Sequence, residues 1–86
     1  MEQLTEIAIT LRGIKEEPDG SSTLVVAEIS TPITDHDDHT WCNVSCPEVL
    51  DGIKPIFGVD GEQALVLSES LIRELWAHSG IIPEVS

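Results

Sequence analysis

The sequence has few basic residues, and this shortage limits what the protein can bind. Four lysines and arginines stand against sixteen aspartates and glutamates, and the formal net charge at pH 7 is −12. A surface this negative repels phosphate groups, which argues against binding to nucleic acid or to an anionic membrane. The same field attracts a basic protein partner. The alternative is that the charge only keeps a small protein soluble.

Long apolar runs are also missing. No stretch approaches the ~20 residues of a membrane-spanning helix, and residues 1–3 contain no basic residue of the kind that opens a signal peptide. We therefore expect a cytoplasmic protein of bacterial type. The hydrophobic content of 41% predicts that residues 1–86 fold as one domain. Because so short a chain has a small core, a homodimer is an open alternative.

Residues 60–79 have the pattern of one amphipathic helix. Asp60 is a good N-cap, and Gln63 is placed to accept the Asp60 N–H in a capping box. His78 can complement the last carbonyls, and Gly80 can take a left-handed conformation that ends the helix. Apolar or small residues recur at intervals of three and four, which predicts one buried stripe. The stripe consists of Ala64, Leu65, Leu67, Ser68, Leu71, Ile72, Leu75 and Trp76.

Four segments before this helix are predicted to be strands, because short apolar stretches alternate there with turn residues. They are residues 4–14, 22–31, 41–46 and 53–59. The turns between them are too short for the crossover that parallel strands need. We therefore predict an α+β fold: an antiparallel four-stranded meander in the order β-β-β-β-α, with the C-terminal helix packed on one face of the sheet.

The alternation of side chains along these segments assigns residues to the two faces of the sheet. In the second segment several apolar residues are consecutive, and we choose the phase that leaves Glu28 in solvent. The residues expected to face the core are Ile7, Ile9, Leu11, Val25, Ala27, Ile29, Cys42, Val44 and Cys46. After the helix, Ile81 and Ile82 of the tail 81–86 are candidates to fold back against the sheet.

Several of these residues together form a pattern that resembles a known family. They are Pro32, Asp37, Asp38, Trp41, Cys42, the Gly-Val-Asp sequence at 58–60 and the Gln-Ala-Leu sequence at 63–65. In these positions the chain is similar to a family of small bacterial domains of unknown function. Trp41 directly before Cys42 departs slightly from the family spacing, and Cys46 is not part of its pattern. The resemblance implies a similar fold and a cytosolic setting, but no activity.

The most polar loop holds Asp35, Asp37 and Asp38, and Trp41 follows it on the strand face opposite the cysteines. An aromatic side chain beside an acidic loop suits an interface anchor. We therefore expect a small acidic protein-interaction module that binds a basic protein surface, as an inhibitor or immunity-like protein binds a nuclease or toxin. The alternatives are a solvated loop without a ligand and a Trp41 that covers a sheet edge or fills a dimer contact. Further acidic residues that are candidates to extend the patch are Glu16, Glu17 and Asp19.

His36, His39, Cys42 and Cys46 are the ligand types of tetrahedral zinc. However, in a regular strand the two cysteines lie about 13 Å apart, which is too far for one metal ion. The separation also exceeds the ~4.4–6.8 Å between the Cα atoms of a disulfide. We therefore expect no metal and no cofactor. A zinc-stabilised module is one alternative, and a self-associating structural domain is another.

The same cysteines and histidines contain the atoms for nucleophilic catalysis. A free buried cysteine is usually inert, however. The sequence has no glycine-rich phosphate loop, no G-x-S-x-G and no HExxH motif. We therefore expect that the protein is not an enzyme.

Overall fold

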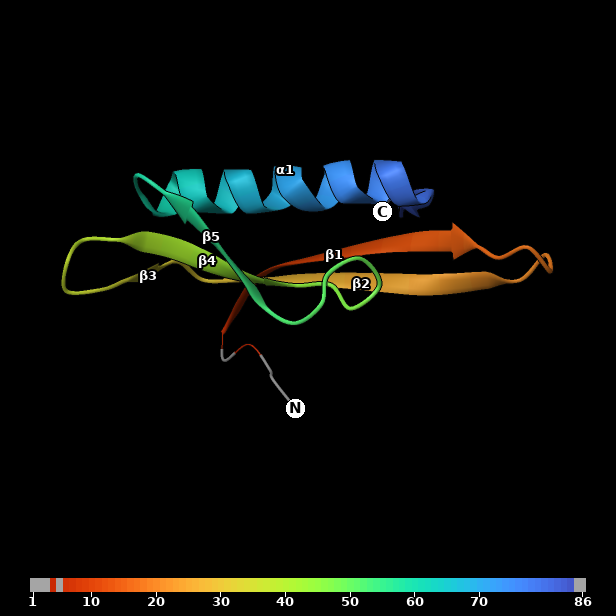
Figure 1. Cartoon of the computed structure of the whole chain (residues 1–86), viewed down its shortest axis with the longest axis horizontal. Coiled ribbons are helices and arrows are strands. Elements are labelled where there is room, and N and C mark those ends of the chain that lie inside the picture. The colour runs from red at the N-terminus through yellow and green to blue at the C-terminus, as the bar shows by residue number, and fades with distance from the viewer. Residues whose placement is uncertain (1–3, 5, 85–86) are drawn as a thin grey trace.

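The computed structural model describes residue 4 and residues 6–84. This part of the chain contains one helix, α1 (Gly61–Ser79), and one antiparallel sheet of six strands. The strands are β1 (Ile7–Glu16), β2 (Ser22–Ser30), β3 (Ile33–Thr34), β4 (Thr40–Ser45), β5 (Lys54–Gly58) and β6 (Ile81–Pro83). The helix lies along one face of the sheet (Figure 1). The fold is therefore α+β as predicted, but the prediction of four strands was wrong.

The two additional strands are short: β3 lies between β2 and β4 in the sequence, and β6 lies after the helix. Strands β1, β2, β4 and β5 pair in that order, each antiparallel to the next, as the meander requires. β3 pairs with β4, where Ile33 lies opposite Trp41. β6 follows the helix and pairs with β1, where Ile82 lies opposite Ile14. Segments of two or three residues are too short to show the alternation that identifies a strand in a sequence.

Most of the predicted inward-facing residues form the core, but Ile7 does not. Ile9 and Leu11 pack against the buried cluster. A β-bulge between Ile7 and Ile9 shifts the register and leaves Ile7 exposed, because a bulge adds one residue and changes the face of those before it. The predicted start of this strand at residue 4 was also wrong: β1 begins at Ile7, and Thr5 lies outside the described residues. The buried hydrophobic residues are Val25, Ala27, Ile29, Cys42, Val44, Cys46, Ala64, Ile72, Trp76 and Ile81.

The helix begins and ends close to where the sequence predicts. Asp60 Oδ1 accepts the backbone N–H of Gln63 at 2.8 Å, as an N-cap does. Gln63 Oε1 accepts from the N–H of Val59 at 2.7 Å, not from that of Asp60, so the predicted capping box is displaced by one residue. At the other end Gly80 has a φ of 72°, and His78 Nδ1 lies 2.8 Å from the Glu74 carbonyl oxygen.

The buried stripe of the helix is narrower than predicted. Its fully buried residues are Ala64, Ser68, Ile72 and Trp76, each four positions after the last. Leu67 is exposed, because a single helix on a flat sheet buries only the row that points at the strands. In the described part of the chain, α1 is not both long and apolar enough to cross a membrane.

Candidate protein-interaction surface

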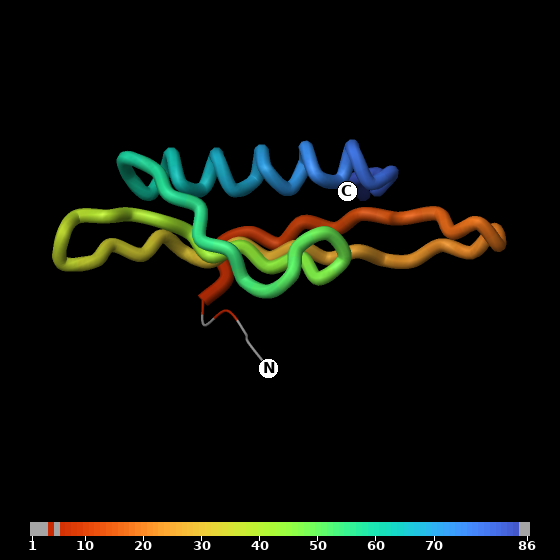
Figure 2. The backbone as a smooth tube through the Cα atoms, in the orientation of Figure 1, coloured from red at the N-terminus to blue at the C-terminus, as the bar shows by residue number. Residues whose placement is uncertain are grey.

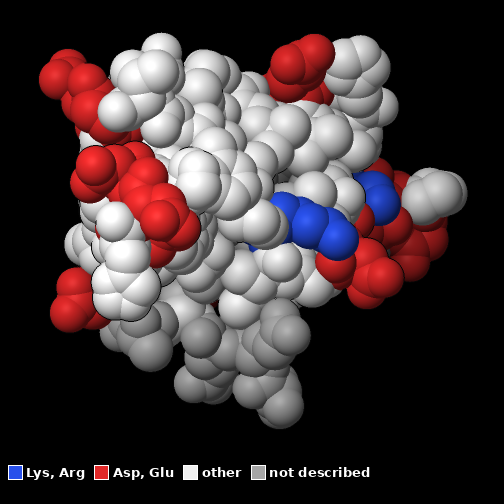
Figure 3. All heavy atoms as spheres, turned by 60° about the vertical axis from the view of Figure 1, so that its left-hand side comes forward, with Lys and Arg blue, Asp and Glu red and all other residues white. Residues whose placement is uncertain are grey.

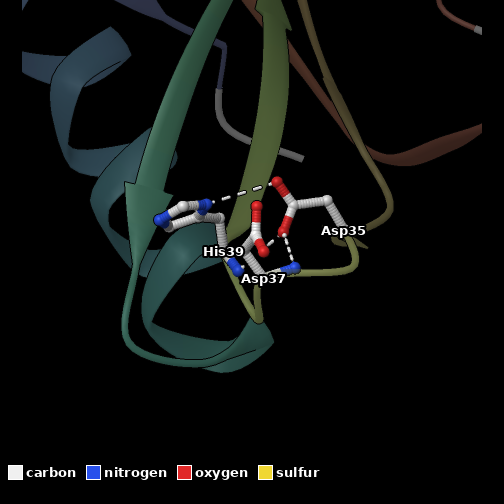
Figure 4. A group of neighbouring side chains, drawn as sticks. All are labelled: Asp35, Asp37 and His39. Carbon is white, nitrogen blue, oxygen red and sulfur yellow. Dashed lines mark hydrogen bonds and ion pairs between the residues drawn. The ribbon is translucent and has the colours of Figure 1, made fainter.

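The acidic loop forms the end of the β3–β4 hairpin, and we call Asp35, Asp37 and Asp38 the acidic tip. The Asp35 carboxylate organises the turn, since its Oδ1 accepts the backbone N–H groups of Asp37 and His39, each at 2.9 Å (Figure 4). Asp38 has a positive φ of 62°, which the short side chain of aspartate tolerates. All three side chains are exposed. The hairpin therefore holds three carboxylates in an ordered turn on the surface.

Hydrogen bonding also sets the protonation of the tip. The backbone N–H of His39 lowers the pKa of the Asp35 carboxyl below its ordinary value, and partial desolvation opposes this effect. His39 Nδ1 lies 3.3 Å from Asp35 Oδ2, which makes an exposed ion pair when the ring is protonated. Asp35 therefore keeps its negative charge to a lower pH than an ordinary aspartate.

An aromatic pair lies on the sheet face that the helix leaves bare. Trp41 of β4 and Phe57 of β5 are directly opposite in the ladder, and their ring centroids are 5.6 Å apart. Trp41 follows Asp38 by three residues, or about 10 Å of extended chain. Trp41 is half-buried, whereas Phe57 is 55% exposed. The more accessible aromatic ring beside the acidic tip is therefore Phe57, which the sequence did not identify.

The other acidic turn lies far from the tip. Glu16, Glu17 and Asp19 belong to the β1–β2 hairpin, which lies at the opposite end of the elongated molecule (Figure 2). The longest extent of the molecule is 50 Å. The prediction that these residues extend the acidic patch was therefore wrong: the two hairpins extend in opposite directions from the centre of the sheet.

The charged side chains are unevenly distributed over the surface. Figure 3 shows acidic side chains at both sides of the view, while most of the surface between them carries neither sign of charge. On the helix-free face the strand alternation places one basic and one acidic residue near the middle of the sheet, Arg12 and Glu28. Near its middle this face thus carries charges of both signs.

The four residues of the zinc alternative are divided between the surface and the core. Cys42 and Cys46 are buried on the side of the sheet that the helix covers, and burial raises the pKa of the Cys42 thiol. His36 and His39 lie exposed in the β3–β4 hairpin. The structure does not bring these four side chains together.

A different group of possible metal ligands does cluster in the described part of the chain. Ligand atoms of Asp35, Asp37 and His39 lie within 4.8 Å of one another. However, both oxygens of Asp35 already take part in contacts within the turn. The hydrogen bonds that form the hairpin turn therefore explain why these three side chains lie close together.

Sequence reasoning identified the acidic tip but not its aromatic neighbour. The position of Phe57 opposite Trp41 depends on the register between β4 and β5. The connection at residues 46–53 is a predicted turn around Asp51 and Gly52. A turn signal of this kind does not specify which residues of the two strands lie opposite each other. The one signal in the sequence is Pro55, two positions before Phe57, because a proline in a strand indicates a sheet edge.

Comparison with models of known protein families, with curated proteins and with solved structures found no match. The resemblance to a family of small bacterial domains therefore stays a prediction that rests on the sequence pattern alone.

Proposed function

We propose that the protein is a small acidic protein-interaction module that binds a basic protein surface through the acidic tip and the aromatic pair. The observation that carries this proposal is the position of the exposed Phe57 ring beside an ordered turn with three carboxylates. Carboxylates steer a basic partner toward the site, and a desolvated aromatic ring supplies much of the binding energy. An inhibitor or immunity-like role toward a nuclease or toxin fits this chemistry.

The conformation of the tip supports the proposal, because an ordered loop loses little entropy on binding. Asp35 is engaged within the turn, whereas Asp37 and Asp38 project exposed carboxylates that are free to meet lysine or arginine side chains. Trp41 packs against Phe57 and holds its ring in place. The alternative proposal is a self-associating structural domain that uses the same aromatic pair as a dimer contact.

Charge reversal tests the proposal. The variant Asp37→Lys/Asp38→Lys is immobilised beside the wild type, and the proteins that each captures from a lysate of the source organism are identified by mass spectrometry. The matched control is Glu16→Lys/Glu74→Lys, which changes the net charge equally at exposed positions away from the tip. We expect the basic partner to be lost with the tip variant and kept with the control.

Two results would contradict the proposal. If the tip variant keeps every partner of the wild type, the acidic tip is not the binding site. If both variants lose the same partners, net charge alone was responsible. The variant Phe57→Ala is a second test. If the ring is a hot spot, we expect this variant to weaken binding of the specific partner by at least about 2 kcal/mol. Native mass spectrometry of the wild type measures the number of subunits and so tests the alternative of a dimer.

A further inference from the structure

One edge of β2 has no neighbouring strand for most of its length. On its other side β2 pairs with β1 from Ser22 to Ser30. On the free side it meets β4 at Glu28 and Ile29 alone. Among the described strands, none pairs with residues 22–27 on this side. About 20 Å of strand edge is therefore open, at 3.3–3.4 Å per residue.

The edge is open because β4 leaves the sheet. Glu28 lies opposite Ser45, and continuing the same register places Pro47 opposite Val26. Proline has no N–H to donate to a ladder, and it is confined to edges and bulges for that reason. After Cys46 the chain turns, with the N–H groups of Val49 and Leu50 both bonded to the Cys46 carbonyl. The next strand position beside β2 thus stays vacant.

Two backbone hydrogen bonds next to β1 and β2 show which backbone groups of β2 point to the vacant side. The Glu17 N–H donates to the Ser21 carbonyl in the hairpin, and the Glu84 N–H donates to the Arg12 carbonyl from the other side of β1. Along an antiparallel strand, successive residues direct their N–H and C=O groups alternately to the two neighbouring strands. Both hydrogen bonds therefore give the same directions for the backbone groups of β2. The N–H and C=O groups of Leu24 and Val26 point away from β1, toward the open edge.

The other free edges carry features that discourage strand addition, and this edge does not. β5 contains Lys54 and Pro55, β6 contains Pro83, β1 has a bulge near its start, and β3 has only two residues. Proline, lysine and bulges are the devices by which natural sheets protect their edges. Residues 22–27 read Ser-Thr-Leu-Val-Val-Ala, with none of these and with no charge. An unprotected apolar edge is a template for a further strand.

The surroundings of the edge favour one kind of occupant. An open groove of about 330 Å³ runs along it, lined by Leu24, Val25, Val26, Glu28, Ser45, Pro47 and Glu48. Its side chains are apolar apart from Ser45 and the two carboxylates, and Leu24 is 55% exposed. The nearest basic side chain on the helix-free face, Arg12, lies on β1 on the far side of β2. A second copy of this chain would bring further negative charge to a groove that already has two carboxylates.

We infer that the free edge of β2 binds an extended segment of a partner protein as an added strand, with apolar side chains along its length and a lysine or arginine beside Glu28 and Glu48. Backbone hydrogen bonds to Leu24 and Val26 would supply affinity, and the carboxylates would select a basic segment. This surface is distinct from the acidic tip, and the inference holds whether or not the tip binds a partner.

Amide hydrogen exchange tests the inference directly. The probe is a short synthetic peptide in which valine alternates with threonine and each end carries lysine; the matched control carries glutamate at both ends. In the free protein, the amides of Leu24 and Val26 are expected to exchange fast, while those of Val25 and Ala27 are protected by β1. At 90% occupancy, the lysine peptide is expected to slow exchange at Leu24 and Val26 about tenfold. The glutamate peptide is expected to have little effect.

A matched pair of variants locates the binding. Val26→Lys places a charge at the open edge, whereas Ile14→Lys places the same charge on the same face of the adjacent interior strand. The two wild-type side chains are almost equally exposed, at 37% and 39%, so both variants are expected to fold. We expect Val26→Lys to lower the affinity for the lysine peptide about tenfold, and Ile14→Lys to lower this affinity less than about twofold.

Three results would overturn the inference. The first is unchanged exchange at Leu24 and Val26 with millimolar peptide. The second is slow exchange of these two amides in the dilute free protein, which would mean that the chain itself covers the edge. The third is exchange that slows with rising protein concentration and no peptide, which would identify a second copy as the occupant.

Discussion

The indole N–H of Trp76 donates a hydrogen bond to the sulfur of Cys46 at 3.5 Å, in the interior of the protein. The two residues are 30 positions apart in the sequence. The bond joins the last turns of α1 to the end of β4, where the chain leaves the sheet. Cys46 is thus an acceptor for a buried donor, as well as a small apolar side chain.

Replacing Cys46 therefore tests this bond. Cys46→Ala is expected to lower the free energy of unfolding by about 2–3 kcal/mol, because it leaves the indole N–H unpaired as well as a small void. The control is Cys42→Ala, which removes a sulfur from the same face. There, the neighbouring Ser68 keeps its bond to the Ala64 carbonyl at 2.7 Å. Cys42→Ala is expected to cost about 1 kcal/mol less. Equal losses in urea denaturation under reducing conditions would show that the bond contributes nothing.

Two glycines leave no room for a Cβ beside residues of the helix. A Cβ at Gly58 would lie 2.5 Å from the backbone nitrogen of Ala64, whereas one at Gly13 would lie 2.8 Å from the Trp76 ring. A helix backbone yields less than a side chain, so Gly58→Ala is expected to destabilise the protein by about 3 kcal/mol and Gly13→Ala by about 1–3 kcal/mol. Gly20 has open space and a φ of 90°, so Gly20→Ala is expected to cost only the ~1–2 kcal/mol of a left-handed alanine. Thermal unfolding compares the three, and a loss for Gly58→Ala no larger than that for Gly20→Ala would contradict the packing.

The tail offers a matched pair of isoleucines. Ile81 is 3% exposed and belongs to the core, whereas Ile82, its neighbour in β6, is 63% exposed. Ile81→Ala is expected to destabilise the protein by about 3 kcal/mol, as loss of a buried isoleucine does. Ile82→Ala is expected to change stability by less than about 0.5 kcal/mol. Chemical denaturation measures both, and similar values would mean that β6 does not dock as described.

The acidic tip is expected to loosen in acid. The pKa of the Asp35 carboxyl is lowered in the folded state, chiefly by the N–H of His39. A lowered pKa means that the ordered turn is fully favoured above the unfolded-state pKa, roughly pH 3.9. This advantage is lost as the pH falls through the lower folded-state value. NMR titration of the folded protein should give a midpoint for Asp35 below the midpoint of the aspartates in the denatured protein. Amide exchange at Asp37 and His39 should become faster below the Asp35 midpoint. A raised midpoint for Asp35 would contradict the hydrogen bonds of the turn.

Local chemistry was sufficient to predict the helix and the faces of the central strands. Asp60 and Gly80 mark the two ends of α1. They could be predicted because capping depends on residues within a few positions of each other. The phase of β2 was correct because only one choice buries Val25 and Ala27 and leaves Glu28 outside. The acidic tip was recognised for the same reason, since its residues are consecutive in the chain.

The sequence by itself determined the fold class, the limits of the helix, the core residues of β2 and β4, and the acidity of the β3–β4 hairpin. The tertiary structure decided the pairing of β6 with β1, the contact between Trp41 and Phe57, the separation of the two acidic hairpins and the open edge of β2. These features depend on the register and lateral order of strands that are distant in the sequence. Alternation along a strand specifies which face a side chain takes, but not which strand lies beside it.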